Sequence, residues 1–278
     1  MKRKFAAVVM AVILLVFCVP SGISAASSRT DVNVYINGRR LTGAVEPVLI
    51  NGRTYVPIRS FCDMMGASSV SWNDKTKTAT VDCRGISVSA RIGDIYIVAN
   101  GRYLACAETL LIGGSTYVPI RSLAAAFMCD VEWDGDRFAA YVNDTYRGVI
   151  APGSRYYNSG DVYWLSRIIS AEAQGEPIAG KIAVGNVILN RVNDGSYPNS
   201  VYGVIFDKKY GTQFTPAASG TVYNTPTEES IIAAKICLEG FSYSEEILYF
   251  MNPEIAVSTW IARNRKYAFT IGNHAFYY

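Results

Sequence analysis

One glutamate stands where a helical pattern places a carboxylate on an apolar face. Leu165, Ile168, Ile169 and Glu172 follow the spacing i, i+3, i+4 and i+7, which forms a single stripe along a helix. A carboxylate in such a stripe loses water, so its charged form is disfavoured and its pKa should rise. A carboxyl group that keeps its proton near neutral pH can act as a general acid, as glycosidic bond cleavage requires. The sequence therefore predicts Glu172 as a catalytic acid; the alternative is a Glu at a helix end that reaches solvent.

The residues around Glu172 belong to a longer ordered set of motifs. The set runs through WLSRIISAEAQGEP (164–177), GKIAVGNVILNRV (180–192), Gln213-Phe-Thr, Tyr249 to Pro253, Thr259-Trp260 and Ile271 to Phe276. This set resembles the SleB-type cell wall hydrolases, the spore-cortex-lytic enzymes, over residues 161–278. The resemblance implies a lysozyme-like α+β fold, peptidoglycan as substrate, and Glu172 as the catalytic acid of an enzyme similar to lytic transglycosylases.

Five further residues are assigned to substrate binding by their position in the resemblance: Glu176, Gln213, Tyr249, Asn252 and Trp260. The amides of Gln213 and Asn252 can hold acetamido and hydroxyl groups. The rings of Tyr249 and Trp260 can pack against a sugar, although either ring can instead belong to the core. Glu176 follows the helix break at Gly175 and Pro177 and lacks the apolar stripe, so a structural or capping role is the favoured alternative for it.

No second acid shares the signature of Glu172. The remaining acids of this region have ordinary alternatives at helix ends or in turns; they are Asp194, Glu228, Glu229, Glu239, Glu245 and Glu246. A single carboxylate can act first as acid and then as base, and the 6-hydroxyl of muramic acid can then close on its own anomeric carbon. We therefore expect 1,6-anhydromuramic products; the alternatives are a muramidase that uses water and a non-catalytic wall-binding protein.

The chain has one histidine, His274. A metal site with two histidines is thus excluded within one subunit, and a Ser-His-Asp triad would have to converge on that ring. A structural role in the last strand is the favoured interpretation of His274. Gly113-Gly114 lacks the Lys-Ser/Thr that follows in a phosphate-binding loop. We expect no metal and no cofactor.

The first 26 residues read as a secretory signal peptide: Lys2-Arg-Lys4, an apolar run, and small residues before Ala26. That apolar run is short for a membrane span, so we expect no stable span after cleavage. Lys2, Arg3 and Lys4 account for the net charge of +3, because the rest of the chain carries 23 basic and 23 acidic residues. This balance gives no indication of nucleic-acid binding. The expected location is outside the cell, in the wall or the spore envelope.

Residues 29–145 contain an internal repeat. Leu49 to Ser60 (LINGRTYVPIRS) recurs as Leu111 to Ser122 (LIGGSTYVPIRS), at an offset of 62 residues. Each unit reads as a strand, an Asn-Gly hairpin, a strand, a short helix after Arg-Ser and a final hairpin, and two such units should pack as one β-rich domain. The repeat resembles the N-terminal module of copper amine oxidases, but residues 1–150 contain no histidine, so the copper chemistry does not follow.

The repeat domain is expected to position the enzyme on the wall. Tyr55, Tyr117, Trp72 and Trp133 could stack on sugars, and packing in the repeat core is the favoured alternative. Four cysteines of this domain allow three disulfide pairings: Cys62, Cys83, Cys106 and Cys129. Cys237 fits a small core residue of a helix.

A Gly- and Ser-rich linker, 146–160, precedes the catalytic domain at 161–278. Helices are expected to begin near 161, 178, 198 and 226, with strands at 247–250 and 268–278.

Overall fold

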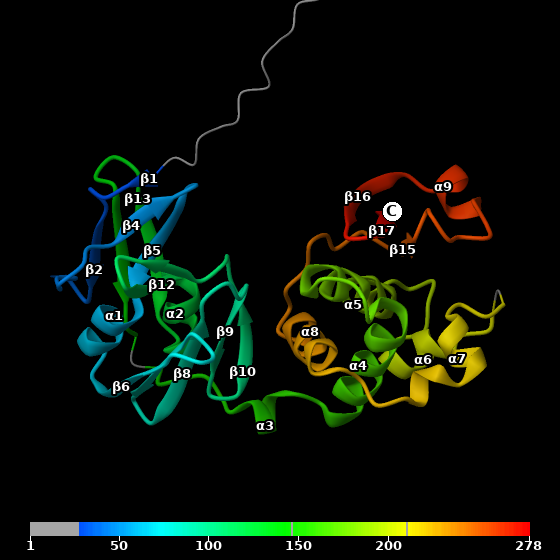
Figure 1. Cartoon of the computed structure of the whole chain (residues 1–278), viewed down its shortest axis with the longest axis horizontal. Helices are drawn as coiled ribbons and strands as arrows, with labels where there is room; N and C mark the ends of the chain where they lie inside the picture. The colour runs from blue at the N-terminus through cyan, green and yellow to red at the C-terminus, as the bar shows by residue number, and fades with distance from the viewer. Residues whose placement is uncertain (1–27, 146, 210) are drawn as a thin grey trace, which may run out of the picture.

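The computed structural model describes residues 28–145, 147–209 and 211–278, and the predicted signal peptide lies outside them. A β-rich N-terminal domain and a mainly helical C-terminal domain with one small sheet lie side by side (Figure 1). Together they give the expected α+β class, with a β-rich domain first.

Each repeat of the N-terminal domain contains two tight hairpins, a helix and a further hairpin. The first repeat comprises β2 (Asn33–Ile36), β3 (Arg39–Arg40), β4 (Val48–Ile50), β5 (Arg53–Pro57), α1 (Ile58–Met64), β6 (Ala67–Asn73) and β7 (Thr78–Cys83). The second comprises β9 (Tyr96–Ala99), β10 (Arg102–Ala105), β11 (Leu110–Ile112), β12 (Ser115–Pro119), α2 (Ile120–Ala126), β13 (Asp130–Asp134) and β14 (Ala139–Asn143). Asn-Gly turns with both residues at positive φ close several hairpins, as at Asn37 and Gly38. Each helix begins one residue before the Arg that was expected to precede it, at Ile58 and at Ile120.

The two repeats exchange hairpins. One sheet has the order β13-β14-β2-β3, and the other has β10-β9-β8-β7-β6, where β8 (Ile86–Arg91) is an added strand. Each of these sheets therefore joins the last hairpin of one repeat to the first hairpin of the other. In the third sheet, which begins with β1 (Ser28–Arg29), β5 pairs antiparallel with β12 so that Val56 faces its repeat equivalent Val118. An approximate two-fold axis passes between these two residues, and neither repeat completes its sheets alone.

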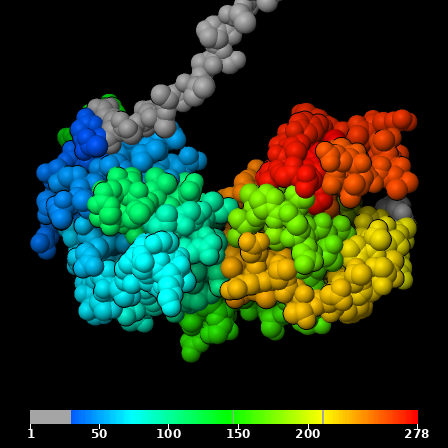
Figure 2. All heavy atoms as spheres, in the orientation of Figure 1, coloured from blue at the N-terminus to red at the C-terminus, as the bar shows by residue number. Residues whose placement is uncertain are grey.

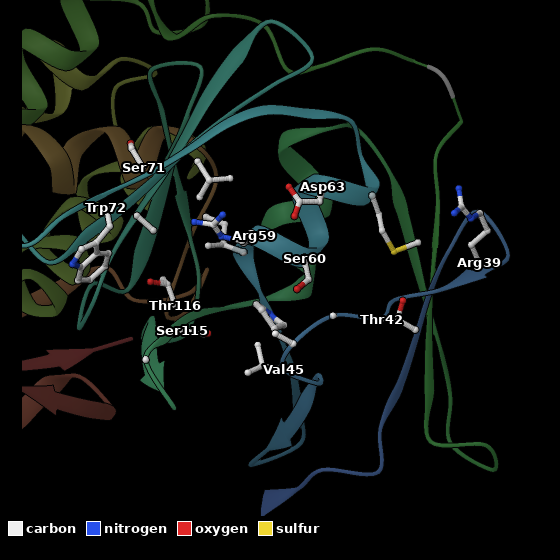
Figure 3. A pocket seen from close by; sticks show the side chains of 18 residues that line it. Arg39, Thr42, Val45, Arg59, Ser60, Asp63, Ser71, Trp72, Ser115 and Thr116 are labelled. Carbon is white, nitrogen blue, oxygen red and sulfur yellow. The ribbon is translucent and has the colours of Figure 1, made fainter.

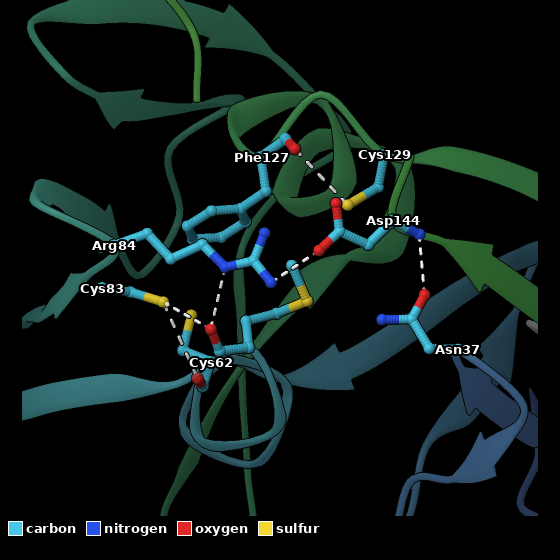
Figure 4. A network of polar contacts seen from close by, with 8 residues as sticks. Asn37, Cys62, Cys83, Arg84, Phe127, Cys129 and Asp144 are labelled. Carbon is cyan, nitrogen blue, oxygen red and sulfur yellow. Dashed lines mark hydrogen bonds and ion pairs between the residues drawn. The ribbon is translucent and has the colours of Figure 1, made fainter. Parts of the chain in front are cut away.

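A buried ion pair ties the chain ends of this domain together (Figure 4). Arg84 donates to the Asp144 carboxylate over 2.6 Å, and the Asp144 side chain is fully buried. The Nε of Arg84 also donates to the Met65 carbonyl at the end of α1, and the Asp144 amide donates to the side chain of Asn37. The network therefore links the turn after β2, the end of α1, the turn after β7 and the end of β14.

The five described cysteines are free thiols. Cys62 and Cys83 are buried close together, where the Cys83 thiol donates weakly to the Cys62 carbonyl (Figure 4). The disulfides that the sequence allowed are absent among these residues, and burial raises the pKa of the Cys83 thiol. These cysteines serve as small apolar core residues.

Three helices form the core of the C-terminal domain: α4 (Ser159–Ala173), α5 (Ile178–Asn193) and α8 (Glu228–Leu238). Asn158 caps α4 by accepting hydrogen bonds from the amides of Gly160 and Asp161, so α4 begins two residues before the expected domain boundary. Gly185 of α5 allows a close approach, because a Cβ there would lie 2.7 Å from the Cys237 sulfur of α8.

A small sheet lies above these helices, with the order β15-β17-β16 (Figure 1). Its strands are β15 (Tyr249–Met251), β16 (Tyr267–Ile271) and β17 (His274–Tyr277), and the shorter helical elements are α6 (Val201–Ile205), α7 (Thr215–Ser219), the 3-10 turn η1 (Thr221–Tyr223) and α9 (Trp260–Asn264). The single strand expected over 268–278 is instead a hairpin, because Gly272 adopts a φ of +59° and reverses the chain.

The two domains contact through β10 and α8 (Figures 1 and 2). Arg102 of β10 makes a bidentate ion pair with Glu239 at the end of α8, and both side chains are largely buried. Tyr157 donates to the same carboxylate and accepts from the Tyr103 amide. The expected linker therefore contributes to the contact, and it contains the helical turn α3 (Gly153–Tyr156).

Replacing one member of this buried pair should destabilise the protein. We expect Arg102→Ala to lower the free energy of unfolding by about 3 kcal/mol, because it leaves the Glu239 carboxylate buried and unpaired. The exposed Arg91, which pairs with Asp94, is the matched control, and Arg91→Ala should cost less than about 1 kcal/mol. Urea denaturation measures both values, and equal losses in the two variants would contradict the structural role of the Arg102 pair.

Candidate active site

Glu172 is the second-last residue of α4 and follows a face that is fully buried. Leu165, Ile168 and Ile169 have no exposed surface, as the stripe predicted. The Glu172 side chain is half-buried, and among the described residues its carboxylate has no hydrogen-bond or ion-pair partner. Desolvation raises the pKa of Glu172 to about 7. This carboxyl group is therefore protonated in a substantial fraction of molecules at neutral pH.

Glu176 has the opposite surroundings. Its buried carboxylate accepts two hydrogen bonds from Asn273, from the backbone amide at 2.9 Å and from the side-chain Nδ2 at 3.0 Å. Burial acts to raise its pKa, but the bonds from Asn273 outweigh burial, and the pKa lies below its ordinary value. These two hydrogen bonds join the α4–α5 junction to the turn between β16 and β17. This geometry supports the structural alternative for Glu176.

Gly272 permits this contact. A Cβ at Gly272 would lie 2.0 Å from the Oε2 atom of Glu176, and its φ of +59° disfavours other residues as well. The hairpin turn can therefore approach the carboxylate only with glycine at this position. The end of α4 is held against the sheet that also carries Tyr249.

A cavity of about 630 Å³ collects three of the predicted binding residues, Gln213, Tyr249 and Trp260. The remaining lining residues come from the segment after α5, from β15 and its preceding residue, and from the end of α9; they are Asp194, Ser196, Tyr197, Leu248 and Arg265. Glu172, Glu176 and Asn252 do not line it. Asn252 instead accepts from the Glu254 amide in the turn after β15. The cavity therefore unites part of the predicted set.

Two arginines that sequence reasoning missed organise this cavity. The guanidinium of Arg265 lies 4.4 Å from the ring centre of Tyr249 and 5.1 Å from that of Trp260. Arg191 of α5 is buried; its Nε donates to the Leu248 carbonyl over 2.8 Å, and desolvation lowers its pKa. A cation at a buried position of an otherwise apolar helix could have indicated Arg191, whereas the short segment that holds Arg265 has no periodic signal.

His274 is buried in β17 and packs against Phe250, with ring centres 5.3 Å apart. Its Nδ1 has no hydrogen-bond partner among the described residues. Burial lowers the pKa of His274, while the nearby Glu176 carboxylate acts to raise it. This placement supports the structural interpretation. Within the described ranges, no three His, Cys, Asp or Glu side chains form a group that could hold a metal ion.

The other acids have partners or lie on the surface. Glu228 and Glu229 occupy the first turn of α8, as expected, and Glu229 also pairs with the buried Lys181 at 2.9 Å. Asp194 lines the cavity, where it accepts from the Ser196 amide in a turn. Asp194 is therefore the one acid of the cavity lining.

Two family models match separate parts of this chain. Residues 175–277 match the family model of the Cell Wall Hydrolase, and residues 35–142 match that of the Copper amine oxidase N-terminal domain. The spore cortex-lytic enzyme of Bacillus subtilis (strain 168) is 40% identical over 120 residues, which are 43% of this chain and 38% of that protein. The corresponding enzyme of Bacillus cereus is 38% identical over 120 residues, 43% of this chain and 45% of that protein. The chain thus spans less than half the length of these relatives.

A solved structure also aligns with the C-terminal region. The catalytic domain of the germination-specific lytic transglycosylase SleB from Bacillus anthracis is 36% identical, with a TM-score of 0.40, and the match covers 46% of this chain and 100% of that domain.

Across the part of this chain that the structure describes, no helix combines the length and apolar character needed to cross a membrane.

Relieving the desolvation of Glu172 should stabilise the protein. Its pKa of about 7 in the folded state lies above the ordinary value of 4.5, so ionisation favours the unfolded state as pH rises between these values. Glu172→Gln cannot ionise, and we expect it to raise the free energy of unfolding by up to about 3 kcal/mol at pH 8 and by little at pH 4. Urea denaturation at both pH values measures this difference. A gain that is equal at pH 4 and pH 8 would contradict the raised pKa.

Proposed function

Since the C-terminal domain of this chain is a cell wall hydrolase domain homologous to the spore cortex-lytic enzymes, we propose that it cleaves the glycan strand of peptidoglycan between N-acetylmuramic acid and N-acetylglucosamine. The observation that carries the proposal is Glu172, a desolvated carboxyl group with a pKa of about 7. A carboxyl group with this pKa is protonated in part of the molecules near neutral pH, and it can transfer that proton to a substrate oxygen.

Glu172 acts first as the acid and then as the base. Its proton goes to the glycosidic oxygen, the bond from that oxygen to the anomeric carbon of muramic acid breaks, and the leaving sugar departs with a hydroxyl group. The Glu172 carboxylate then takes the proton of the muramic 6-hydroxyl, whose oxygen bonds to the same anomeric carbon. The attack is intramolecular and benefits from proximity, and it restores the protonated acid.

The cavity residues hold the sugar units. Tyr249 and Trp260 supply ring faces, and Gln213 supplies amide groups for acetamido and hydroxyl contacts. Arg265 places a cation between the two rings, which suits the lactyl carboxylate of a muramic unit. Asn252 follows β15 directly and lies outside the cavity lining, and we propose that it contacts a sugar unit at the edge of the site. Glu176 acts through its bonds to Asn273, as a positioning residue.

The proposal includes the place of action. Export would depend on residues 1–26, and the domain would then act on the wall or the spore cortex. The names of the relatives state cortex lysis for those proteins, and we extend this role to the present chain.

Water is the alternative nucleophile, because the cavity lining contains a carboxylate that could activate it. Asp194 lines the cavity and could serve as a second carboxylate, which a muramidase requires. Its hydrogen bond to the Ser196 amide engages one of its oxygens in a turn, so the single-carboxylate route is preferred. A purely wall-binding role is disfavoured because the carboxylate of Glu172 is intact.

Removing the transferable proton should abolish most of the activity. We expect Glu172→Gln to lower the rate on purified peptidoglycan by about two orders of magnitude or more, while Glu246→Gln in an exposed turn leaves it unchanged. In the unmodified protein the rate should fall as pH rises above about 7, because the acid form of Glu172 is lost. Near-full activity of a folded Glu172→Gln variant would disprove the assignment.

The products should carry 1,6-anhydromuramic ends, because the 6-hydroxyl competes with water from within the bound sugar. Mass spectrometry of the digest identifies these ends by the loss of one water relative to a reducing sugar. Reducing muramic ends alone would show that water attacks, and the variant Asp194→Asn would then test the second carboxylate. Reducing glucosamine ends would assign cleavage to the other glycosidic bond.

A further inference from the structure

The N-terminal domain contains two pockets that the repeat makes equivalent. The first has a volume of about 530 Å³ and lies among α1, the β6–β7 hairpin and the β11–β12 turn of the other repeat (Figure 3). The second has a volume of about 230 Å³ and lies among α2, the β13–β14 hairpin and the β4–β5 turn. Equivalent positions of the two repeats line both pockets, among them Arg59 and Arg121, Ser60 and Ser122, and Trp72 and Trp133. Each repeat thus completes the pocket of the other.

Each pocket presents an exposed indole. Trp72 is 44% exposed and Trp133 is 41% exposed, whereas Tyr55 and Tyr117 are buried. The core interpretation is therefore confirmed for the tyrosines and is wrong for the tryptophans. An indole that is open to solvent at a pocket suits stacking on a flat apolar ligand face.

The charges of the two pockets match as well. Arg39, Arg59 and Asp63 line the first pocket, and Arg53, Arg121 and Glu132 line the second. Each pocket therefore has two cations and one anion. Among the described residues these four arginines form no ion pair with any carboxylate, so their guanidinium groups are available to an anionic ligand.

We propose that these two pockets bind the glycan strand of peptidoglycan, with an indole against a sugar ring and arginines against the carboxylate of a muramic unit. Stacking aromatic rings suit the apolar faces of sugars, and the net positive charge selects an acidic glycan over a neutral one. The choice of peptidoglycan rests on the proposed function of the C-terminal domain. Two linked sites bind a long strand more tightly than either site alone.

This arrangement would present the strand to the catalytic domain. The repeat domain is joined to the C-terminal domain through the buried Arg102–Glu239 pair, so the pockets and the cavity at Tyr249 belong to one connected framework. A strand held in the pockets raises the local concentration of cleavable bonds near Glu172.

Nuclear magnetic resonance of the indole N–H groups tests the proposal site by site. The chain has four tryptophans, and each gives one indole signal, which Trp→Phe variants assign. The full chain is labelled with ¹⁵N and carries Glu172→Gln so that the ligand persists. The probe is a soluble oligomer of alternating N-acetylglucosamine and N-acetylmuramic acid without peptide stems. We expect saturable shifts of the Trp72 and Trp133 signals, and smaller shifts with an N-acetylglucosamine oligomer of equal length.

The same titration separates this proposal from the proposed function. A shift of the Trp260 signal alone would support the catalytic cavity and overturn the pocket proposal. Shifts of Trp72 and Trp133 without Trp260 would support the pockets and count against the cavity. Equal shifts with the neutral and the acidic oligomer would overturn the role of the arginines.

Variants measure the contribution of each pocket. We expect Arg59→Ala and Arg121→Ala each to weaken binding at their own pocket by about two- to fivefold, the range of an exposed ion pair. Trp72→Ala should weaken its pocket by about two- to tenfold, with partial rescue in Trp72→Phe. Lys75→Ala and Leu111→Ala alter exposed residues outside both pockets and serve as controls. Unchanged affinity in the Arg59 and Trp72 variants, or equal losses in the controls, would overturn the proposal.

Discussion

The apolar face of α4 is the constraint on which the chemistry of this protein depends. Its leucine and isoleucines are fully buried, so the helix cannot rotate without exposing them, and Glu172 is held at the edge of the core. The free energy of desolvating that carboxyl group is supplied by the packing of α4 against α5 and α8. Because no described residue compensates the charge, the proton is retained near neutral pH. Stability and acid strength are therefore coupled at a single residue.

Two glutamates four residues apart show how environment sets the role of a carboxyl group. Glu172 receives no described hydrogen bond and has a raised pKa, whereas Glu176 receives two from Asn273 and has a lowered one. The helix break between them turns the second side chain toward the β16–β17 hairpin. One glutamate is thus suited to proton transfer and the other to holding the sheet in place.

In the N-terminal domain the two repeats form related pockets because they exchange hairpins. Each sheet takes one hairpin from either repeat, and the pairing of Val56 with Val118 places the copies about a two-fold axis. A residue that recurs in both copies therefore occupies two related positions, either both buried, as for Tyr55 and Tyr117, or both exposed. The exposed Trp72 and Trp133 are the clearest result, because a core role would have buried them.

The sequence by itself determined what depends on local order. The period of residues 165–172 indicated a buried helix face with a carboxylate, the Asn-Gly turns indicated hairpins, and the offset of 62 residues indicated the repeat. These features follow from backbone geometry and from the spacing of side chains along one element, so no distant contact is needed to recognise them.

Only the tertiary structure decided which distant residues meet. The contact of Glu176 with Asn273, the cavity shared by Gln213, Tyr249 and Arg265, and the exposure of Trp72 each depend on segments that are far apart in the chain. The expected strand over 268–278 became a hairpin because a turn at Gly272 lets Asn273 reach a buried carboxylate. Such contacts are selected by the packing of whole elements, and the periodicity of a single segment does not specify its partners.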